Sequence, residues 1–398
     1  MRIVAFDSKD FNRAKTIRKP AESPAVGSVV EYKGYFTPLG VGLTFKHDDL
    51  FRNAYVEACR KWADEFSLPM DRPLLSSYPI RSQMPLRAAI PLCDKIIQEV
   101  QDYIELAFFS WISLPLDQHP TVGVGGQRTP RKEVPTPKFL RDVAPSFAYM
   151  TAWSFFGKRN ASDYTAIVDG FRGKLTPAWT DLTSRTKPQI YSRGDECNPF
   201  IAAADMVAFL TDVELWQRED IGKRKLSPDN VKSVWDQYQF DVDVRYLDPN
   251  VRSKITWFSE NLIDVGPYLA RPVIFFLADE IEKIELASPK PLDLAQTELP
   301  LEPISPPKPR KFHEVLQRTP PYFAATQLAF ERGGCVQFFD RYTDADRIRD
   351  GDVLVYMGEQ SRRVASAYED AYEVEVMSAR ELRRRLKRES IKEEKQEG

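Results

Sequence analysis

The stretch IVAFD, residues 3–7, decides how the rest of the chain is interpreted. Four consecutive apolar residues are typical of a strand buried on both faces, and the acid that follows marks the end of such a strand. The pattern recurs in AIVD, residues 166–169, just before Gly170. A carboxylate at the end of a central strand emerges at the rim of the sheet, where sites in α/β folds lie. Taken singly, an acid such as Asp7 or Asp169 is more often a turn residue that ends a strand.

A third acid lies in the apolar segment FIAAADMVAFL, residues 200–210. If this segment is helical, the residues three and four positions from Asp205 are all apolar, so this face is expected to be buried. A buried carboxylate must be paired, protonated or bound to a cation. A structural Asp bonded to a backbone amide or an arginine is one explanation. A site is the other, provided that more carboxylates converge on it.

The surrounding elements predict a mixed α/β fold. Asn198 as cap and Pro199 in the first turn predict the start of the helix that holds Asp205. Residues 29–32 and 41–45 flank a turn-rich segment and predict a hairpin. We expect Asp48 or Asp49 to cap the next helix, and a further long helix to run from about residue 92 to 111.

Proline divides the chain. The segment 287–311 contains seven prolines, which stiffen the backbone and remove amide donors. It is predicted to be a semi-rigid spacer, with a proline-rich ligand for a partner as the alternative. We expect a larger domain over residues 1–286, with a helical insertion at about 67–160, and a small α+β module over 312–398.

The C-terminal module contains three predicted strands, at residues 335–339, 352–357 and 372–376. A final helix is predicted from Ser378. Its basic residues are Arg380, Arg383, Arg384, Arg385, Lys387 and Arg388. This helix could bind nucleic acid or an acidic protein partner, or it could simply have one solvated face.

Composition narrows the class of protein. The chain has 398 residues with 42% apolar and 29% charged residues, which predicts globular domains and not disorder. It lacks an apolar run of about 18 residues, so we expect no membrane span. The first residues do not resemble a secretory signal, and the four cysteines are widely spaced without a C-x-x-C pair. Free thiols indicate a reducing compartment, so a cytoplasmic location is expected.

The residues available for catalysis favour carboxylate chemistry. The three histidines, His47, His119 and His313, are far apart in sequence, which gives little support to a histidine-rich metal site or a Ser-His-Asp triad. Crowded carboxylates repel one another, and a divalent cation is the usual reason to tolerate them. Oxygen ligands favour Mg²⁺ or Mn²⁺ over zinc.

Two segments also resemble a known family. The opening IVAFDS (3–8), with the hairpin and helix predicted after it, and the late IYS (190–192) and IAAADMVA (201–208) resemble the DUF3800 proteins of the ribonuclease H-like superfamily. The resemblance implies a ribonuclease H-like mixed sheet flanked by helices. It also implies an acidic two-metal site with Asp7 and Asp205 as ligands. Asp169 comes from the strand pattern and not from this resemblance.

A fourth carboxylate is expected from the helix after the hairpin, where Asp48, Asp49 and Glu57 are available. Helix capping accounts equally well for the first two of these residues.

Several basic residues could position a nucleic acid. The net charge of −2 means that such contacts would rely on local patches. Arg172 and Lys174 lie just beyond Asp169 and are predicted to touch a substrate phosphate. Arg128, Arg131 and Lys132 lie in a Gly- and Pro-rich loop that could cradle phosphates or could be a mobile, solvated loop.

Two aromatic runs, at residues 108–111 and 153–156, could stack bases, but core packing explains apolar clusters of this kind better. The leading hypothesis is a metal-dependent nuclease in which Asp7, Asp169 and Asp205 hold Mg²⁺ or Mn²⁺ and a metal-bound water attacks the phosphodiester. The alternative is a non-catalytic scaffold that binds nucleic acid or protein, with the C-terminal module recruiting a partner.

Overall fold

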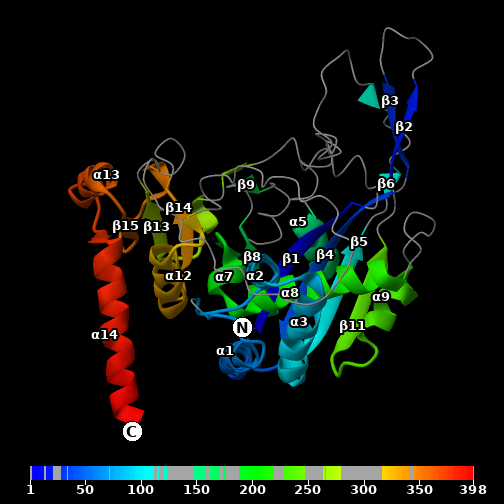
Figure 1. Ribbon diagram of the computed structural model, residues 1–398, viewed down its shortest axis with the longest axis horizontal. Helices are drawn as coiled ribbons and strands as arrows, with labels where there is room; N and C mark the ends of the chain where they lie inside the picture. Colours follow the sequence, from blue (N-terminus) through cyan, green and yellow to red (C-terminus); the bar gives the residue numbers. More distant parts are fainter. Residues whose placement is uncertain are drawn as a thin grey trace, which may run out of the picture. The chain divides into compact units, whose positions relative to one another are not determined.

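The computed structural model (Figure 1) describes most of the two predicted globular parts. The described residues are 2–12, 15–20, 28–33, 35–70, 72–111, 114–115, 121–122, 147–157, 161–170, 174–175, 188–218, 227–246, 263–264, 266–278, 316–339 and 345–397. The chain forms two units, Met1–Val273 with Ala329–Val336, and Ile274–Leu328 with Gln337–Gly398. The predicted spacer at 287–311 lies outside the described residues, so the predicted boundaries stay predictions.

A mixed sheet forms the centre of the first unit, with strand order β10-β8-β1-β4-β5-β11. The strands are β1 (Arg2–Asn12), β4 (Tyr35–Phe45), β5 (Ile104–Trp111), β8 (Tyr164–Asp169), β10 (Gln189–Tyr191) and β11 (Asp241–Tyr246). The strands β1, β4 and β5 are antiparallel neighbours, whereas β8 and β10 run parallel to β1. The predicted mixed α/β class is confirmed.

Helices cover both faces of this sheet (Figure 1). They are α1 (Asp48–Glu65), α2 (Ser77–Gln83), α3 (Leu86–Val100), α5 (Phe147–Phe156), α7 (Gly194–Cys197), α8 (Pro199–Arg218) and α9 (Pro228–Trp235). Phe155 of α5 packs edge-on against Phe6 and Phe108. Phe200 of α8 packs against Phe45. Because Phe6 and Phe45 lie on opposite faces of the pleated sheet, α5 and α8 cover opposite sides.

The helix α8 begins as predicted. The side-chain oxygen of Asn198 accepts hydrogen bonds from the backbone amides of Phe200 (3.1 Å) and Ile201 (3.3 Å), which confirms the cap. Residues 201–211 of α8 are all buried, so this helix is enclosed on every side between the sheet and α1, α2, α3 and α9.

The predicted hairpin is wrong. Strand β4, which contains residues 41–45, pairs with β1, β5 and the short β6 (Leu114–Pro115). Strand β3 (Ser28–Lys33) instead pairs with β2 (Lys15–Pro20) and β7 (Thr121–Val122). The apolar run of β4 is fully buried, which requires a partner strand on both of its edges, and β1 and β5 supply them.

The predicted long helix from 92 to 111 is also wrong in its second half. α3 ends at Val100, and Ile104–Trp111 forms β5, an inner strand of the sheet that lies within the expected helical insertion. The run IELAFFSW is too uniformly apolar to be read as a strand by alternation. Asp48 and Asp49 do not cap α1 either, since the N-cap position is His47 and makes no side-chain bond; both acids lie in the first turn.

The four-stranded sheet of the second part of the chain has the order β14-β13-β15-β16, and β13, β15 and β16 run parallel. The strands are β13 (Val273–Leu277), β14 (Cys335–Phe338), β15 (Val353–Tyr356) and β16 (Glu375–Ser378), and the helices are α12 (Pro320–Arg332), α13 (Glu359–Glu369) and α14 (Ala379–Glu397). The first two predicted strands are confirmed, whereas the third lies about three residues later. Strand β13 was missed because it precedes the predicted spacer.

Among the described residues, no helix combines the length and apolar character needed to cross a membrane.

A two-stranded sheet of β9 (Lys174–Leu175) and β12 (Ile263–Asp264) completes the described strands of the first unit.

The aromatic runs are mostly core, as predicted. Phe108, Phe109, Trp111 and Phe155 are at most 1% exposed, whereas Trp153 on the same helix as Phe155 is 41% exposed. The expectation of core packing therefore fails for Trp153 alone among these residues.

Replacing Phe155 tests this packing. We expect Phe155→Ala to lower the free energy of unfolding by about 3–5 kcal/mol, because the ring contacts several neighbours and leaves a cavity. The exposed Trp153→Ala on the same helix is the control and should cost about 1 kcal/mol or less. Urea unfolding followed by circular dichroism measures both, and equal losses would show that α5 does not pack as described.

Candidate functional site: an acidic cluster

Asp7 and Asp169 lie side by side on neighbouring parallel strands. The last parallel pair of β1 and β8 is Phe6 with Val168, so the next residue of each strand is an aspartate at the same level. Adjacent strands are about 4.8 Å apart. Asp169 is the last residue of β8, as predicted, but β1 continues past Asp7 to Asn12, so Asp7 is not at a strand end.

Both acids point toward the face that α8 covers. Side chains alternate along a strand, and Phe6 contacts α5 on the other face. Asp7 and Asp169 therefore share the face of Ala5 and Val41, against which α8 packs. The sheet and the helix that carries Asp205 thus bring the three predicted acids to the same layer of the fold.

The environment of Asp169 favours its protonated form. The carboxylate accepts a hydrogen bond from the backbone amide of Gly194 (N···Oδ1 2.6 Å). Burial raises the pKa of Asp169 well above its usual range, and the negative charges of Asp195 and Asp7 raise it further. The charges of these three aspartates therefore interact directly.

Asp195, on the short helix α7, links the strand acids to α8. Its Oδ2 accepts a hydrogen bond from the Ser76 hydroxyl (2.9 Å). Burial raises the pKa of Asp195 to about 7, and the charges of Glu196 and Asp205 act in the same direction. The bond from Ser76 and the positive charge of Arg193 oppose this rise. The fourth carboxylate of the cluster is therefore Asp195 and not a residue of the helix after β4.

Asp205 is held by the N-terminus of α2, which begins at Ser77. Asp205 is only 6% exposed, and its Oδ2 accepts a hydrogen bond from the backbone amide of Ser77 (2.6 Å). The adjacent residues Ser76 and Ser77 thus bind Asp195 and Asp205 respectively. The amide bond to Asp205 agrees with the structural explanation of this residue, and its place beside Asp195 agrees with the functional one.

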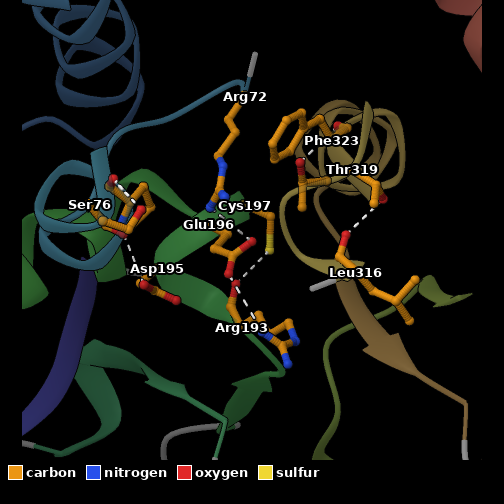
Figure 2. A network of polar contacts seen from close by, with 12 residues as sticks. Arg72, Ser76, Arg193, Asp195, Glu196, Cys197, Leu316, Thr319 and Phe323 are labelled. Atoms are coloured by element: carbon orange, nitrogen blue, oxygen red, sulfur yellow. Dashed lines mark hydrogen bonds and ion pairs between the residues drawn. The ribbon is translucent and has the colours of Figure 1, made fainter. Parts of the chain in front are cut away.

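Glu196 forms a buried ionic group next to the cluster (Figure 2). It lies 3.5 Å from Arg72 and 3.6 Å from Arg193, and the Arg72 and Glu196 side chains are 6% and 3% exposed. Figure 2 shows Arg72 and Glu196 pointing toward one another, with Asp195 and Ser76 to one side. Removing one partner of such a pair leaves a buried charge and typically costs about 3–5 kcal/mol.

The backbone is strained where α7 begins. Arg193 adopts the left-handed region (φ 55°, ψ 45°), which is unfavourable for a residue with a side chain. Strain of this kind concentrates at functional sites, where neighbouring contacts hold it in place. Here the strained residue directly precedes Gly194 and Asp195, which both contact other members of the cluster.

The donor set of the cluster suits a hard divalent cation, since it consists of carboxylate oxygens that raise one another's pKa. However, within the described part of the chain, no three His, Cys, Asp or Glu side chains are arranged so that they could hold a metal ion. One carboxylate oxygen of each of Asp7, Asp169 and Asp205 already accepts a hydrogen bond from a backbone amide. The chemistry of the residues fits a cation, whereas their present arrangement is that of a hydrogen-bonded cluster.

The predicted phosphate-binding residues lie mostly outside the described chain. This holds for Arg172 and for Arg128, Arg131 and Lys132. Lys174 lies in β9. Their roles stay predictions. Arg193 and Asp195 were not predicted, because no apolar pattern or motif surrounds them in sequence.

A separate cavity of about 370 Å³ lies at the opposite ends of the parallel strands. Its lining includes Thr165, Gln189, Arg52 and Asn198, with Asp48 and Asp49 from the first turn of α1. The four aspartates of the cluster are not among its lining residues. Asp48 and Asp49, two of the three candidates for the fourth ligand, therefore belong to a different place in the fold.

A family described as "Domain of unknown function (DUF8203)" matches residues 21–265, more than half of the chain. The chain belongs to this family. The match includes Asp169, Asp195 and Asp205 and begins after Asp7. The resemblance to DUF3800 proteins was wrong, because the family that matches is a different one. The motifs behind it were short apolar segments around single acids, a pattern that many buried strands and helices share.

The chain is also similar to a protein of Archaeoglobus fulgidus described as "Uncharacterized protein". The two are 23% identical over 364 residues, which is 89% of this chain and 96% of the relative. The similarity therefore extends over both units of the chain, beyond the segment that the family covers.

Gly194 is required for the close packing around Asp169. A Cβ at this position would lie 2.5 Å from Cδ1 of Ile201, 2.8 Å from Cβ of Tyr191 and 3.3 Å from Oδ1 of Asp169. We expect Gly194→Ala to lower the free energy of unfolding by about 1–3 kcal/mol. Ile201→Val removes the closest atom, so the double variant should lose less than the sum of the single losses, as measured by urea unfolding. Strict additivity would contradict this packing.

The pKa of Asp195 predicts a pH dependence of stability in the metal-free protein. The pKa is about 7 in the folded state and about 3.9 in an unfolded chain. The stability that this group contributes is fully present below about pH 4 and is lost as the pH rises through about 7. Asp195→Asn cannot ionise, so the melting temperature of the variant relative to wild type should rise between about pH 5 and pH 8. An unchanged difference in EDTA would contradict the raised pKa.

Proposed function

We propose that the first unit has a ribonuclease H-like fold and hydrolyses phosphodiester bonds of DNA or RNA with the help of Mg²⁺ or Mn²⁺. The observation that carries this proposal is the acidic cluster, in which the charge of Asp7 acts on Asp169, that of Asp195 on Asp169, and that of Asp205 on Asp195. Four carboxylates from β1, β8, α7 and α8 are thereby linked across the chain.

The strand arrangement supports the finer fold assignment. Three antiparallel strands, β1, β4 and β5, are followed in the chain by β8 and β10, which extend the sheet in parallel on the other side of β1. The helix α8 then returns across the face that carries Asp7. A mixed sheet of this kind, flanked by helices and with acids from β1, β8 and the helix α8 that follows these strands, is what a ribonuclease H-like nuclease needs.

The electrostatics of the cluster favour a cation as the missing partner. Without one, Asp195 titrates near neutral pH and Asp169 above its usual range, so the cluster keeps protons to limit its negative charge. A divalent cation would replace these protons, and when bound it would activate a water and stabilise the leaving oxygen. Asp7, Asp169, Asp195 and Asp205 would be its ligands, with the oxygens of Asp7, Asp169 and Asp205 giving up hydrogen bonds from backbone amides.

The remaining residues of the site would orient this chemistry. The side chain of Arg193 is 25% exposed and lies beside the cluster, so it is the described cation best suited to touch a substrate phosphate. Glu196 holds both Arg193 and Arg72, which fixes the direction of α7. Ser76 would fix the orientation of Asp195 through its hydroxyl.

Cleavage assays test the proposal. Wild type should cleave labelled single-stranded, duplex or hybrid substrates with Mg²⁺ or Mn²⁺ and lose this activity in EDTA. Asp169→Asn and Asp205→Asn should each lower the rate at least about a hundredfold, because they remove ligands of the ion that stabilises the transition state. The matched control is Asp102→Asn, an exposed aspartate before β5, which should cleave like wild type.

Titration calorimetry separates metal binding from catalysis. Wild type should bind the cation with a stoichiometry that Asp205→Asn abolishes and Asp102→Asn preserves. Folding of each variant is checked by circular dichroism. Cleavage that persists in Asp205→Asn, or wild-type inactivity on every substrate despite a native fold, would overturn the nuclease proposal.

A non-catalytic scaffold is the second candidate. It is favoured by the present arrangement of the described acids, which do not form a metal-ligand set, and by the bond from the Ser77 amide that already satisfies Asp205. This candidate expects no cation-dependent heat and no cleavage, but retained binding of nucleic acid or protein. A protein partner for the C-terminal module and a cytoplasmic location stay predictions.

A further inference from the structure

The first half of α14 lines a cationic groove in the second unit. The groove has a cavity volume of about 400 Å³. Its charged lining consists of Arg380, Arg383, Arg384 and Lys387, and Pro321 and Met357 lie among its other lining residues. Among the described residues that line it, none is acidic. A hollow whose described charges are four positive ones is suited to an anion.

The spacing of these residues places them on one side of the helix. Positions 380, 383, 384 and 387 are separated by three or four residues, so their side chains follow one stripe about 10 Å long. Leu382 lies off this stripe and is fully buried, which anchors the helix through another face. The stripe is therefore not needed for the packing of α14.

The four cations are not neutralised by neighbouring acids. All four are exposed, and among the side chains that the structure describes none forms an ion pair or hydrogen bond with them. Other arginines of the same unit behave differently, since Arg385 pairs with Glu375 (2.9 Å) and Arg362 and Arg363 pair with Glu359. The stripe therefore carries four positive charges that no described acid compensates.

The groove lies where parallel sheets commonly bind ligands. Met357 directly follows β15, and Ala379, which also lines the groove, directly follows β16. The strands β13, β15 and β16 are parallel, so both residues mark the carboxyl ends of strands. Ligands of open parallel sheets bind outside this edge.

We propose that this groove binds the phosphate backbone of a nucleic acid without sequence preference. Three of the four cations are arginines, whose planar guanidinium groups match phosphate oxygens in pairs. A stripe about 10 Å long can meet successive phosphates of one strand, and the described lining of the groove contains no aromatic side chain that would stack bases. The choice of nucleic acid over an acidic peptide rests on the proposed nuclease function of the first unit.

Binding assays on the full chain test this inference independently of cleavage. Fluorescence anisotropy with labelled oligonucleotides of unrelated sequence is measured in EDTA, so that a cation-dependent nuclease cannot act. The double variant Arg383→Ala/Arg384→Ala should bind at least about tenfold more weakly. The slope of log affinity against log salt should fall by about 1.4–1.8, because two phosphate contacts are lost.

The matched control is Arg362→Ala/Arg363→Ala on α13. It removes the same charge from exposed positions of the same unit, but these arginines lie outside the groove and pair with Glu359. It should keep the affinity and the salt slope of wild type. Circular dichroism and thermal unfolding establish that both variants are folded.

Three outcomes would overturn the inference: equal losses in both double variants, no loss in the groove variant, or tighter binding of a polyglutamate peptide than of the oligonucleotides. The result is separable from the proposed function. If wild type cleaves nucleic acid but the groove variant binds it normally, only this inference is overturned. If binding depends on the groove but the protein cleaves no substrate, only the nuclease proposal is overturned.

Discussion

The first unit is organised around the cost of burying negative charge. Asp205 lies in a helix that the sheet and four other helices enclose, so its carboxylate requires a partner from another part of the chain. The amide of Ser77 supplies one, and the neighbouring Ser76 hydroxyl does the same for Asp195. The N-terminus of α2 and the two acids therefore hold one another in place. The buried carboxylate of Glu196 is likewise stabilised, by ion pairs with Arg72 and Arg193.

This constraint explains why the cluster can be both structural and functional. Backbone amides and hydroxyls stabilise the ionised forms, whereas burial and mutual repulsion favour the protonated forms, and for Asp169 and Asp195 the second effect prevails. A protein that only needed to fill its interior would be at least as stable with apolar residues at these positions. On the proposed function, the four carboxylates and the left-handed Arg193 serve more than packing.

The sequence predicted the parts that local patterns determine and missed those that depend on distant partners. The cap at Asn198, the apolar helix around Asp205 and the strand that ends at Asp169 follow from neighbouring residues, and the structure has them. The pairing of β4 with β1 and not with β3 depends on tertiary burial, and so does the strand character of residues 104–111. Asp195 was missed because its neighbours in sequence give no apolar pattern. Only the bond to Ser76 and the charges of Asp169 and Asp205 mark it.

The long separation between Ser77 and Asp205, 128 positions in sequence, has a consequence for synthesis of the chain. While the ribosome is still translating the first 200 residues, Asp205 is not yet available to the Ser77 amide of α2, and β1 lacks its parallel neighbour until β8 has emerged. Contacts this distant in sequence form slowly. The nascent protein therefore exposes an unfinished sheet edge for much of its elongation, a period in which chaperones would be expected to protect it.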